Sequence, residues 1–394
     1  MNVNTDNIYA GRGDASMHDE YLDFINYVFG FNGREQDFPK LLPKLYARED
    51  NPAASSYVIV ENGRMKAAVG AFGHAMTVCG RELRCRSIGN VAAHPYDKSR
   101  GFMKRLMNMA VDDMVRDGIV MSTLGGRRQR YNYFSYEKSG TTYRFSVVPD
   151  NMRHTYGADR DAHHRFDIRV VKADDAASLD AIASLYARQQ YAPIRSRERL
   201  YDILRSWKMV PVALWEENRF AGYAVLRDNA VTEWLMAEES PSEIEDAAIC
   251  LFDWKGASNL TFKLPAFATA YIDVLYTLAE GYALEINESY SILNFAAVTD
   301  AFLALKATYT TLPDGKLTLL IHGRAGDERI TLSVQDGKTA VSVAAEEEAV
   351  DVELGHLEAI NLLFSSFCPA RDRLPAYARV WLPLPIWMYA ADEV

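Results

Sequence analysis

Residues 91–106 place the end of a strand, a basic loop and the start of a helix in direct succession. The strand ends in small residues, and Pro95 stops its pairing because proline has no N–H to donate. The spacing of apolar residues then predicts a helix over residues 100–117, which Gly118 ends. A short apolar run over residues 119–124 follows, and a right-handed crossover would lay it beside the first strand. The segment therefore predicts a sheet with a helix packed across two neighbouring strands.

The loop that opens this helix has properties of a phosphate-binding loop. The first N–H groups of a helix point outward and carry partial positive charge. Lys98 and Arg100 add positive charge, and Gly101 has no Cβ, so a pyrophosphate can approach the backbone closely. A solvated helix cap explains the loop taken alone equally well. The small residues before the loop and the second short strand favour an extended ligand that carries phosphates.

The order of elements in residues 1–150 recurs in residues 151–288. The first range holds a helix, three apolar runs, the helix of the basic loop and two short strands, and Asn62-Gly63 marks a hairpin. The second range holds a helix, three strands and a helix, without similarity residue by residue. Residues 289–394 hold four short alternating strands and a helix, with Asp336-Gly337 at a hairpin turn. These patterns predict an α+β chain of three domains with these boundaries.

The pattern Val-x-x-x-Pro-x-x-Lys-x-x-Gly, from Val91 to Gly101, resembles the acetyl-CoA motif of GNAT acetyltransferases. Met103 stands where that motif usually has a small residue, and this departure resembles the enhanced-intracellular-survival (Eis-like) branch. That branch has two GNAT lobes and a C-terminal domain similar to sterol carrier protein type 2 (SCP2). The resemblance covers essentially the whole chain. It implies two GNAT-like mixed-sheet lobes followed by an SCP2-like α/β domain.

The resemblance also implies an activity and a cofactor site. The chain would transfer an acetyl group from acetyl-CoA to a primary amine by direct attack, without a metal. Backbone groups of Val91, Ala92 and Ala93 would hold the pantetheine arm and the acetyl carbonyl. The other residues of the acetyl-CoA site would be Lys98, Ser99, Arg100, Gly101, Phe102, Met103, Lys104, Gly126 and Arg127.

The second lobe has no equivalent of the basic loop. Its corresponding residues, 238–243, carry three glutamates, whose carboxylates would repel a pyrophosphate. We therefore expect one acetyl-CoA site per chain.

Two tyrosines are candidates for the acid that protonates the departing CoA thiolate. A tyrosine suits this role because its pKa of ~10 keeps it protonated at neutral pH. The run from Tyr131 to Tyr136 resembles the Eis-like Tyr-x-x-Phe-Gly-Tyr, with Ser135 in place of glycine, and selects Tyr131. The run from Tyr136 to Gly140 resembles the general GNAT Tyr-x-Lys-x-Gly and selects Tyr136. We favour Tyr131, although packing against the sheet explains both tyrosines as well.

The base is expected at the end of the chain. In the Eis-like branch the C-terminal carboxylate enters the active site, which implies Val394 here, and residues 385–394 are apolar enough to be buried. A terminal carboxylate has a pKa of ~3.5, so it acts as a base only where desolvation raises its pKa. Otherwise it orients the amine. A solvated, frayed terminus is the alternative.

Composition excludes several classes of partner. A net charge of −10 argues against nucleic acid, which requires a basic face. No stretch is apolar over the length of a membrane span, and the four cysteines form no CxxC pair, so we expect a cytoplasmic protein. His163-His164 has no spaced partner, which argues against a metal site. The family resemblance suggests a homo-oligomer.

A carrier for a lipid or another apolar ligand is the alternative function. In that case residues 289–394 would hold the ligand and the two acetyltransferase lobes would be inactive. The basic loop and Tyr131 favour the enzyme.

Overall fold

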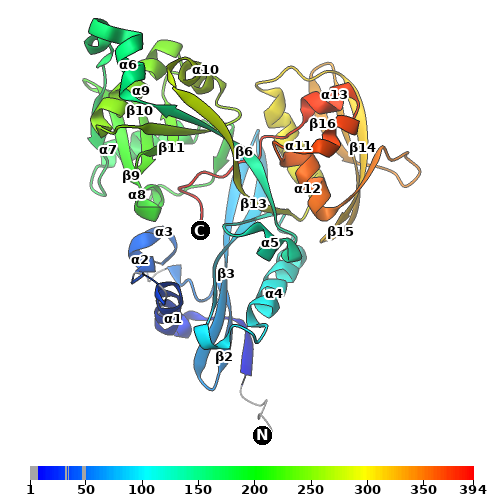
Figure 1. The fold of residues 1–394 in the computed structure, drawn as a ribbon. Coiled ribbons are helices and arrows are strands. Elements are labelled where there is room, and N and C mark those ends of the chain that lie inside the picture. Colours follow the sequence, from blue (N-terminus) through cyan, green and yellow to red (C-terminus); the bar gives the residue numbers. More distant parts are fainter. Residues whose placement is uncertain (1–7, 32, 34, 47–49) are drawn as a thin grey trace.

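In the residues that the structure describes, the strands form two β-sheets, one of 13 strands and one of four (Figure 1). The computed structural model describes residues 8–31, 33, 35–46 and 50–394. The large sheet runs through two lobes, and the small sheet belongs to a third unit beside them (Figure 1).

The first lobe is a set of antiparallel hairpins followed by one parallel crossover. Its helices are α1 (His18–Gly30), α2 (Phe38–Leu41), α3 (Pro43–Tyr46) and α4 (Phe102–Arg116), and its strands are β1 (Ile8–Arg12), β2 (Ser56–Glu61), β3 (Arg64–Val78), β4 (Arg81–Ala93) and β5 (Met121–Leu124). The predicted hairpin is confirmed, because Asn62 and Gly63 have φ of +52° and +70° between β2 and β3. The predicted crossover is also confirmed, since α4 joins β4 to β5 and these two strands are parallel.

Helices cover both faces of this part of the sheet. Alternate residues of β3 point to opposite sides, so Ala67, Val69 and Ala71 pack with α4, whereas Ala68 and Phe72 pack with α1. A strand buried on both faces reads as a continuous apolar run, and this explains why β3 shows no polar alternation.

The second lobe repeats this topology. Its helices are α7 (Ala176–Tyr186), α8 (Leu200–Arg205), α9 (Pro241–Lys255) and α10 (Thr269–Leu278), and its strands are β7 (Asp167–Val170), β8 (Tyr191–Pro193), β9 (Val210–Glu216), β10 (Arg219–Arg227), β11 (Ala230–Met236) and β12 (Leu260–Pro265). β9, β10 and β11 are antiparallel neighbours, and α9 crosses over to β12, which is parallel to β11. The predicted repeat of elements is therefore present in the strand pairing.

Two long strands join the lobes. β6 (Glu137–Val147) pairs with β12 of the second lobe and with β13 (Gly281–Ile292), and β13 also pairs with β5 of the first lobe. The large sheet has the order β1-β2-β3-β4-β5-β13-β6-β12-β11-β10-β9-β7, and β8 pairs with β3. Both lobes thus share one continuous sheet.

The predicted domain boundaries do not coincide with breaks in the fold. The one after residue 150 falls inside helix α6 (Pro149–Tyr156), and the one after residue 288 falls inside β13. β13 was not recognised from the sequence because Glu285, Asn287 and Glu288 interrupt its apolar pattern. The third unit begins after β13, at helix α11 (Phe295–Ala307).

The third unit packs helices against the four-stranded sheet. Its strands are β14 (Gly315–Gly323), β15 (Gly326–Gln335), β16 (Lys338–Val343) and β17 (Val352–Gly355), in the order β16-β15-β14-β17, and its further helices are α12 (His356–Phe364) and α13 (Ala376–Trp381). The predicted turn at Asp336-Gly337 is confirmed by φ of +50° and +73°.

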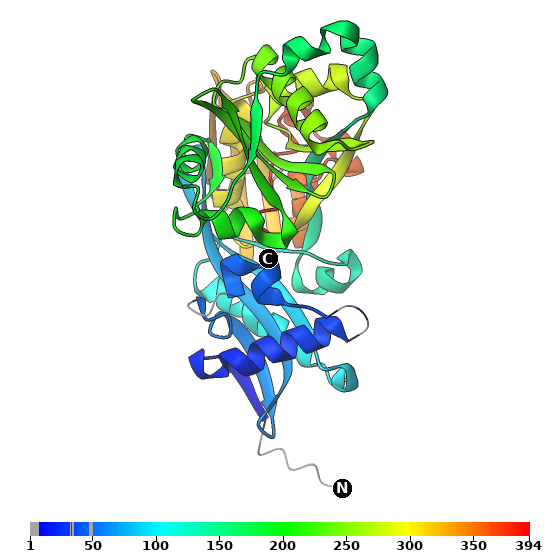
Figure 2. The same ribbon diagram turned by 90° about the vertical axis from the view of Figure 1, so that its left-hand side faces the viewer.

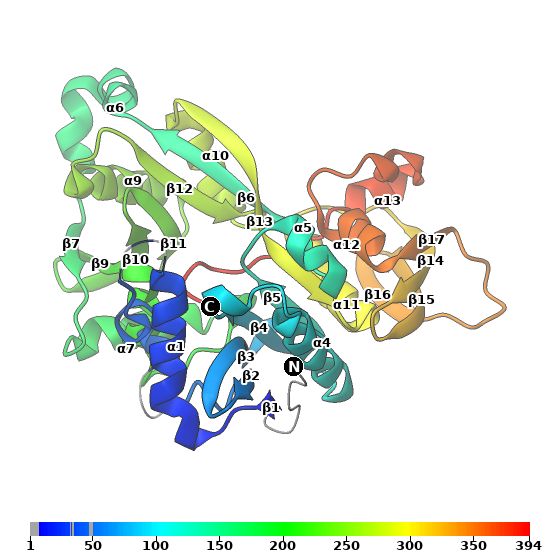
Figure 3. The ribbon, with the colours of Figure 1, turned by 60° about the horizontal axis from the view of Figure 1, so that its bottom comes forward.

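The last residues leave the third unit and return to the lobes. Figure 3 shows this tail, residues 382–394, passing between the second lobe and the first, and Figure 2 shows its end at the junction of the two lobes. Within the tail, Trp387, Met388 and Tyr389 are buried. The expected burial of the chain's apolar ending is therefore confirmed.

The described part of the chain lacks a membrane-spanning helix and a metal-binding cluster. Its helices include none that is long and apolar enough to cross a membrane. It also has no cluster of three or more His, Cys, Asp or Glu side chains that could hold a metal ion. Its four cysteines are unpaired.

Candidate active site

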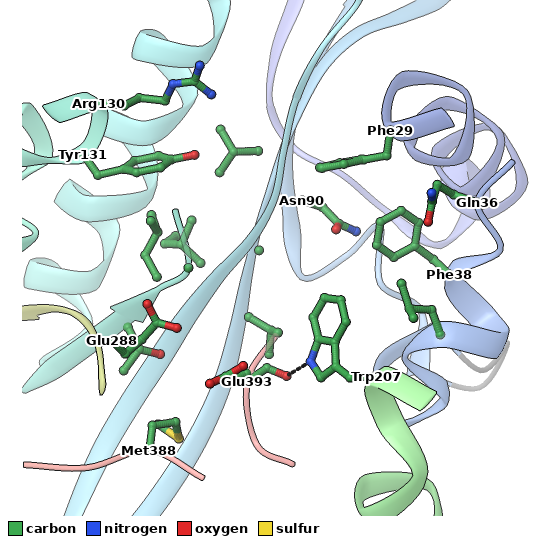
Figure 4. Close-up of a pocket in the computed structure, with 18 of the residues that line it drawn as sticks. Phe29, Gln36, Phe38, Asn90, Arg130, Tyr131, Trp207, Glu288, Met388 and Glu393 are labelled. Carbon is green, nitrogen blue, oxygen red and sulfur yellow. Dashed lines mark hydrogen bonds between the residues drawn. The ribbon is translucent and has the colours of Figure 1, made fainter. Parts of the chain in front are cut away.

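A cavity of about 520 Å³ lies where β4 and β5 part (Figure 4). The two strands are paired only from Cys85 with Met121 to Ile88 with Leu124. Just beyond this point β4 carries a bulge, since its register with β3 shifts and Asn90 has φ +49°. The cavity is lined by the β4 residues that follow the last pair and by the end of β5: Gly89, Asn90, Val91, Thr123, Leu124 and Gly125.

The predicted phosphate-binding loop has the expected form at the start of α4. Gly101 is the N-cap residue and has a φ of +73°. Because glycine has no side chain, it cannot accept a hydrogen bond from the first N–H groups of the helix. A ligand is therefore free to approach the first N–H groups, those of Phe102, Met103 and Lys104. Lys98, Ser99 and Lys104 are exposed.

Arg100 differs from the expectation. Its guanidinium donates to both carboxylate oxygens of Glu61, at 2.6 and 2.7 Å, and to Asp97 at 3.1 Å, and it lies 4.4 Å from the centre of the Phe102 ring. The hairpin turn after β2 brings Glu61 next to the loop, and the sequence alone does not reveal this neighbour. Arg100 therefore stabilises the loop by pairing with two carboxylates, those of Glu61 and Asp97.

Of the predicted residues on β4, Val91 lines the cavity, whereas Ala92 is buried against α1. Gly126 and Arg127 follow β5 directly. Gly126 has φ +150°, and a Cβ there would lie 2.4 Å from the ring of Tyr131. Glycine at this position therefore lets the Tyr131 ring take its place beside the end of β5.

The two candidate tyrosines lie in different surroundings. Tyr131, in helix α5 (Arg128–Tyr131), lines the cavity, and Figure 4 shows its hydroxyl directed toward the open space. Burial raises its pKa, and Arg130 partly offsets this. Tyr136 is fully buried in the core, with its hydroxyl 2.6 Å from the Ser122 hydroxyl, and burial raises its pKa strongly. Tyr131 alone of the two faces the cavity.

The serine that replaces the family glycine adopts a glycine-like conformation. Ser135 has φ +68° in the turn between the two tyrosines. Its carbonyl accepts a hydrogen bond of 3.1 Å from His356 of α12, in the third unit. The third unit thus touches the turn that carries Tyr131.

Carboxylates gather at the other side of the cavity. Val394 lies against Gly89, where an added Cβ would be 3.4 Å from the Val394 carbonyl carbon. Glu393 and Glu288 also line the cavity (Figure 4). Burial, followed by the charge of Glu288, raises the pKa of Glu393 to about 7. Burial also raises the pKa of Glu288, against the opposing effect of Lys138, 3.5 Å away.

Several cavity residues were not foreseen from the sequence. Glu288 comes from the unrecognised strand β13, and Trp207 and Arg227 come from the second lobe. Phe29 and Phe38 close the cavity on the side of α1 and α2 (Figure 4). A signal existed for Glu288 only, which is one of two acidic residues in the run that forms β13.

The corresponding place in the second lobe is closed. Ser240 caps α9 by accepting from the N–H of Glu243, and the Glu243 carboxylate pairs with Arg165 and Arg219. After β11 and β12 part, the N–H of Met236 donates to the hydroxyl of Tyr271 at 2.7 Å. Protein groups occupy the helix start and the strand end that remain accessible in the first lobe.

Comparisons with known proteins agree with this geometry. Residues 12–143 match the family model described as an acetyltransferase (GNAT) domain. No curated protein sequence matches the chain. Its fold is similar to that of two GCN5-related N-acetyltransferases. The one from Anabaena variabilis is 14% identical with a TM-score of 0.65 over 98% of both chains. The one from Kribbella flavida is 16% identical with a TM-score of 0.65 over 100% of both chains.

A third similar structure is Eis1 from Mycobacterium abscessus, at 13% identity and a TM-score of 0.63 over 98% of this chain and 100% of that one. At such identities these likenesses show a shared fold. The family match covers the parted strands, the helix that opens at Gly101, and Tyr131. The chain is therefore an enzyme whose catalytic unit is an acetyltransferase (GNAT) domain.

Proposed function

We propose that this enzyme transfers the acetyl group of acetyl-CoA to a primary amine in the cavity between β4 and β5. One observation carries the proposal. A single cavity brings together the unpaired end of β4, a tyrosine hydroxyl and a group of carboxylates. These are the three components that an acyl transfer to an amine requires: a carbonyl-binding backbone, an acid, and a base or cation-binding group.

The chain's own residues suit the two ends of acetyl-CoA. The first N–H groups of α4, next to exposed Lys98 and Lys104, would hold the pyrophosphate. The bulged backbone at Asn90 and Val91 would pair with the pantetheine arm, because its groups are displaced from the regular β3 ladder. Closure of the equivalent place in the second lobe supports one site per chain.

The transfer would then be direct. The amine nitrogen attacks the thioester carbonyl carbon, the new C–N bond forms, and the C–S bond breaks. Backbone N–H groups at the end of β4 stabilise the oxyanion. Tyr131 donates its proton to the departing thiolate sulfur, and the Val394 carboxylate takes the proton that the amine nitrogen loses.

The acceptor would be a cationic amine. Glu288, Glu393 and the Val394 carboxylate concentrate negative charge on one side of the cavity. Like charges held close together favour protonation, as the raised pKa of Glu393 indicates, and a bound ammonium group would relieve their repulsion. The chain's net charge of −10 is compatible with such a substrate.

A second candidate function rests on the third unit, which we propose is the SCP2-like domain. A cavity of about 940 Å³, with a mainly apolar lining that includes Leu354, Leu362 and Phe367, lies between this unit and β6. It favours a carrier for an apolar ligand as the alternative. The two functions are separated by the first experiment below.

The first prediction concerns cofactor stoichiometry. Calorimetric titration with acetyl-CoA should give one site per chain, and a panel of primary amines should release CoA. Gly101→Ala should weaken acetyl-CoA binding, since it strains a φ of +73° and adds a methyl group where phosphate would approach. Gly118→Ala is the matched control, because Gly118 ends the same helix with φ +68° and open space around it. No acetyl-CoA binding, or two equal sites, would refute the proposal, and binding of a fatty-acid probe alone would favour the carrier.

The second prediction concerns the acid. Tyr131→Phe should lower kcat by about 10² or more while the acetyl-CoA Kd changes little. Tyr136→Phe should leave kcat nearly unchanged and cost stability of about 1 kcal/mol, through its lost hydrogen bond to Ser122. Turnover assays and urea unfolding of both variants measure this. The opposite ranking of the two kcat values would assign the acid to Tyr136.

The third prediction concerns Val394. A protein made to end at Val394 should be active, and the same protein extended by a short C-terminal peptide should lose most of its kcat because its carboxylate is displaced. Removal of residues 392–394 should do the same. The matched control carries the same peptide at the N-terminus, and Tm should stay close to that of the unextended protein. Equal turnover in all forms would exclude the terminal carboxylate as the base.

The fourth prediction concerns pH. Because the pKa of Glu393 is raised to about 7, its carboxylate gains a proton near neutrality, and attraction for a cationic amine weakens as pH falls through 7. KM for the amine should therefore rise about three- to tenfold between pH 8 and pH 6. In Glu393→Gln this additional pH dependence should disappear, whereas the titration of the amine itself affects both proteins equally. Identical KM profiles would show that Glu393 does not bind the acceptor.

A further inference from the structure

The second lobe retains the strand arrangement of an acetyltransferase site but encloses little space there. β11 and β12 are paired only at Ala230 with Thr261 and at Val231 with Phe262, and then diverge as β4 and β5 do. The cavity between the two strands measures about 80 Å³, against about 520 Å³ in the first lobe, and a separate cavity of about 380 Å³ lies beyond the end of β11, at Met236 and Ala237. The lining of the cavity between the strands includes Glu233 of β11 and Tyr389 of the tail. A residue of the chain's own tail thus lies where the first lobe has its open cavity.

The tail is held there by a buried ion cluster. The guanidinium of Arg195 donates to both oxygens of Glu233, at 2.7 and 2.8 Å, and to both oxygens of Asp392, at 3.0 and 2.7 Å. Only 2% of its side chain is exposed. Tyr223 donates to Glu233 at 2.5 Å, and the Arg195 guanidinium lies 4.1 Å from the centre of the Tyr186 ring. A planar guanidinium can bind two carboxylates in this way, whereas a lysine cannot.

Backbone contacts hold the tail on both sides of this cluster. Tyr191 of the second lobe donates to the carbonyl of Trp387, and the side-chain amide of Asn287 bonds both the N–H and the carbonyl of Met388, at 2.8 and 3.1 Å. Near the end, Lys44 of the first lobe donates to the carbonyls of Ala391 and Glu393, each at 2.6 Å.

The indole of Trp207 holds the last part of the tail. Its N–H donates to the carbonyl of Glu393 at 3.1 Å (Figure 4). Trp207 and the next residue, Lys208, have φ of +60° and +59°, a conformation that bulky residues rarely adopt. Such backbone strain persists only where the surroundings enforce it, and here it aims a side chain of the second lobe at the tail.

The position of Asp392 limits where the following residues can lie. Val394 follows Asp392 by two positions, so the Val394 Cα stays within about 7 Å of the Asp392 Cα. Within this reach Glu393 and Val394 enter the first lobe's cavity, and Val394 rests on Gly89. Anchoring Asp392 therefore determines which cavity groups face the substrate.

We propose that the second lobe acts as the receptor for the C-terminal tail, and that Arg195 is a positioning residue that sets Glu393 and Val394 in the catalytic cavity of the first lobe. This inference rests on the proposed acetyl transfer. It assigns a role to a lobe that would otherwise be a duplicate without a cofactor site. In the second lobe, Tyr389 of the tail lies at the position where the first lobe has its open cavity.

The test compares two variants of the cluster with a control ion pair. Asp392→Asn keeps the shape of the side chain and leaves Arg195 paired with Glu233, so no unpaired charge is buried. This variant should therefore fold even if Arg195→Lys does not. Arg81→Lys is the matched control, since Arg81 binds Asp300 at 2.5 Å at another junction of the full-length protein. Hydrogen exchange of residues 385–394, read by mass spectrometry, reports the tail. Acetyl-CoA-dependent CoA release with a primary amine reports kcat and both KM values.

We expect faster exchange of the tail and a loss in kcat of about ten- to a hundredfold in Asp392→Asn and Arg195→Lys, because small displacements of catalytic groups have effects of this size. KM for acetyl-CoA should not change, since its phosphate-binding loop is remote from the cluster. Arg81→Lys should behave as the unmodified protein.

Unchanged exchange would show that Arg195 does not hold the tail, and faster exchange with unchanged kcat would show that the tail's position does not matter for catalysis. Either result overturns the inference while the acetyltransferase function stands. If the unmodified protein releases no CoA with any amine, the proposed function itself fails. Hydrogen exchange alone then decides whether the second lobe is the tail's receptor.

Discussion

The separation of a parallel strand pair is the constraint on which the rest of this structure depends. Hydrogen bonds join β4 to β5 over only four residue pairs, and beyond Ile88 and Leu124 each strand follows its own course. Backbone groups that leave a ladder must find other partners, because unpaired polar groups are costly to bury. In the first lobe these groups border a cavity, in which a substrate can serve as the partner. The bulge at Asn90 lies at this gap, and Gly89 leaves room in it for Val394, since an added Cβ would lie 3.2 Å from the Val394 side chain.

The second lobe shows the other solution to the same constraint. Its strands β11 and β12 part after two pairs, but a tyrosine hydroxyl takes the Met236 N–H, a serine caps α9, and Tyr389 of the tail enters the gap. The same strand arrangement therefore yields one open and one closed place, and the side chains of Ser240 and Tyr271 and the tail residue Tyr389 contribute to the closure. In the second lobe the polar backbone groups at the parted strands have partners within the protein, and the strand arrangement is kept. This lobe can therefore serve as a rigid support for the tail, and the buried cluster around Arg195 is where the tail is attached.

Much of the fold could be predicted from local sequence. Asn62-Gly63 and Asp336-Gly337 identified their hairpins because those residue types tolerate positive φ. The basic loop and the apolar spacing after it located α4, which begins at Phe102. The sequence favoured Tyr131 over Tyr136 only through motif resemblance, because which of the two hydroxyls reaches the cavity depends on how the turn between them packs. The ion pair of Arg100 could not be predicted, because its partner Glu61 is 39 positions away. Glu288 and Trp207 were missed altogether, because only the pairing of β13 and the packing of the second lobe bring them to the cavity.

The carboxylates of the cavity also explain why the tail needs so many anchors. Glu288, Glu393 and Val394 lie on one side of a partly enclosed space, and their mutual repulsion would push the tail out into water. Burial, followed by the charge of Glu288, raises the pKa of Glu393. Hydrogen bonds from Lys44 and Trp207 and the Arg195–Asp392 pair oppose the repulsion from two lobes at once. Burial lowers the pKa of Lys44 to about 8, and the charges of Asp392 and Glu393 oppose this shift, so carboxylates of the tail help to keep this anchor protonated. A cationic amine that entered the cavity would reduce this repulsion. Binding of such an acceptor would therefore stabilise the tail in the position that the proposed reaction requires.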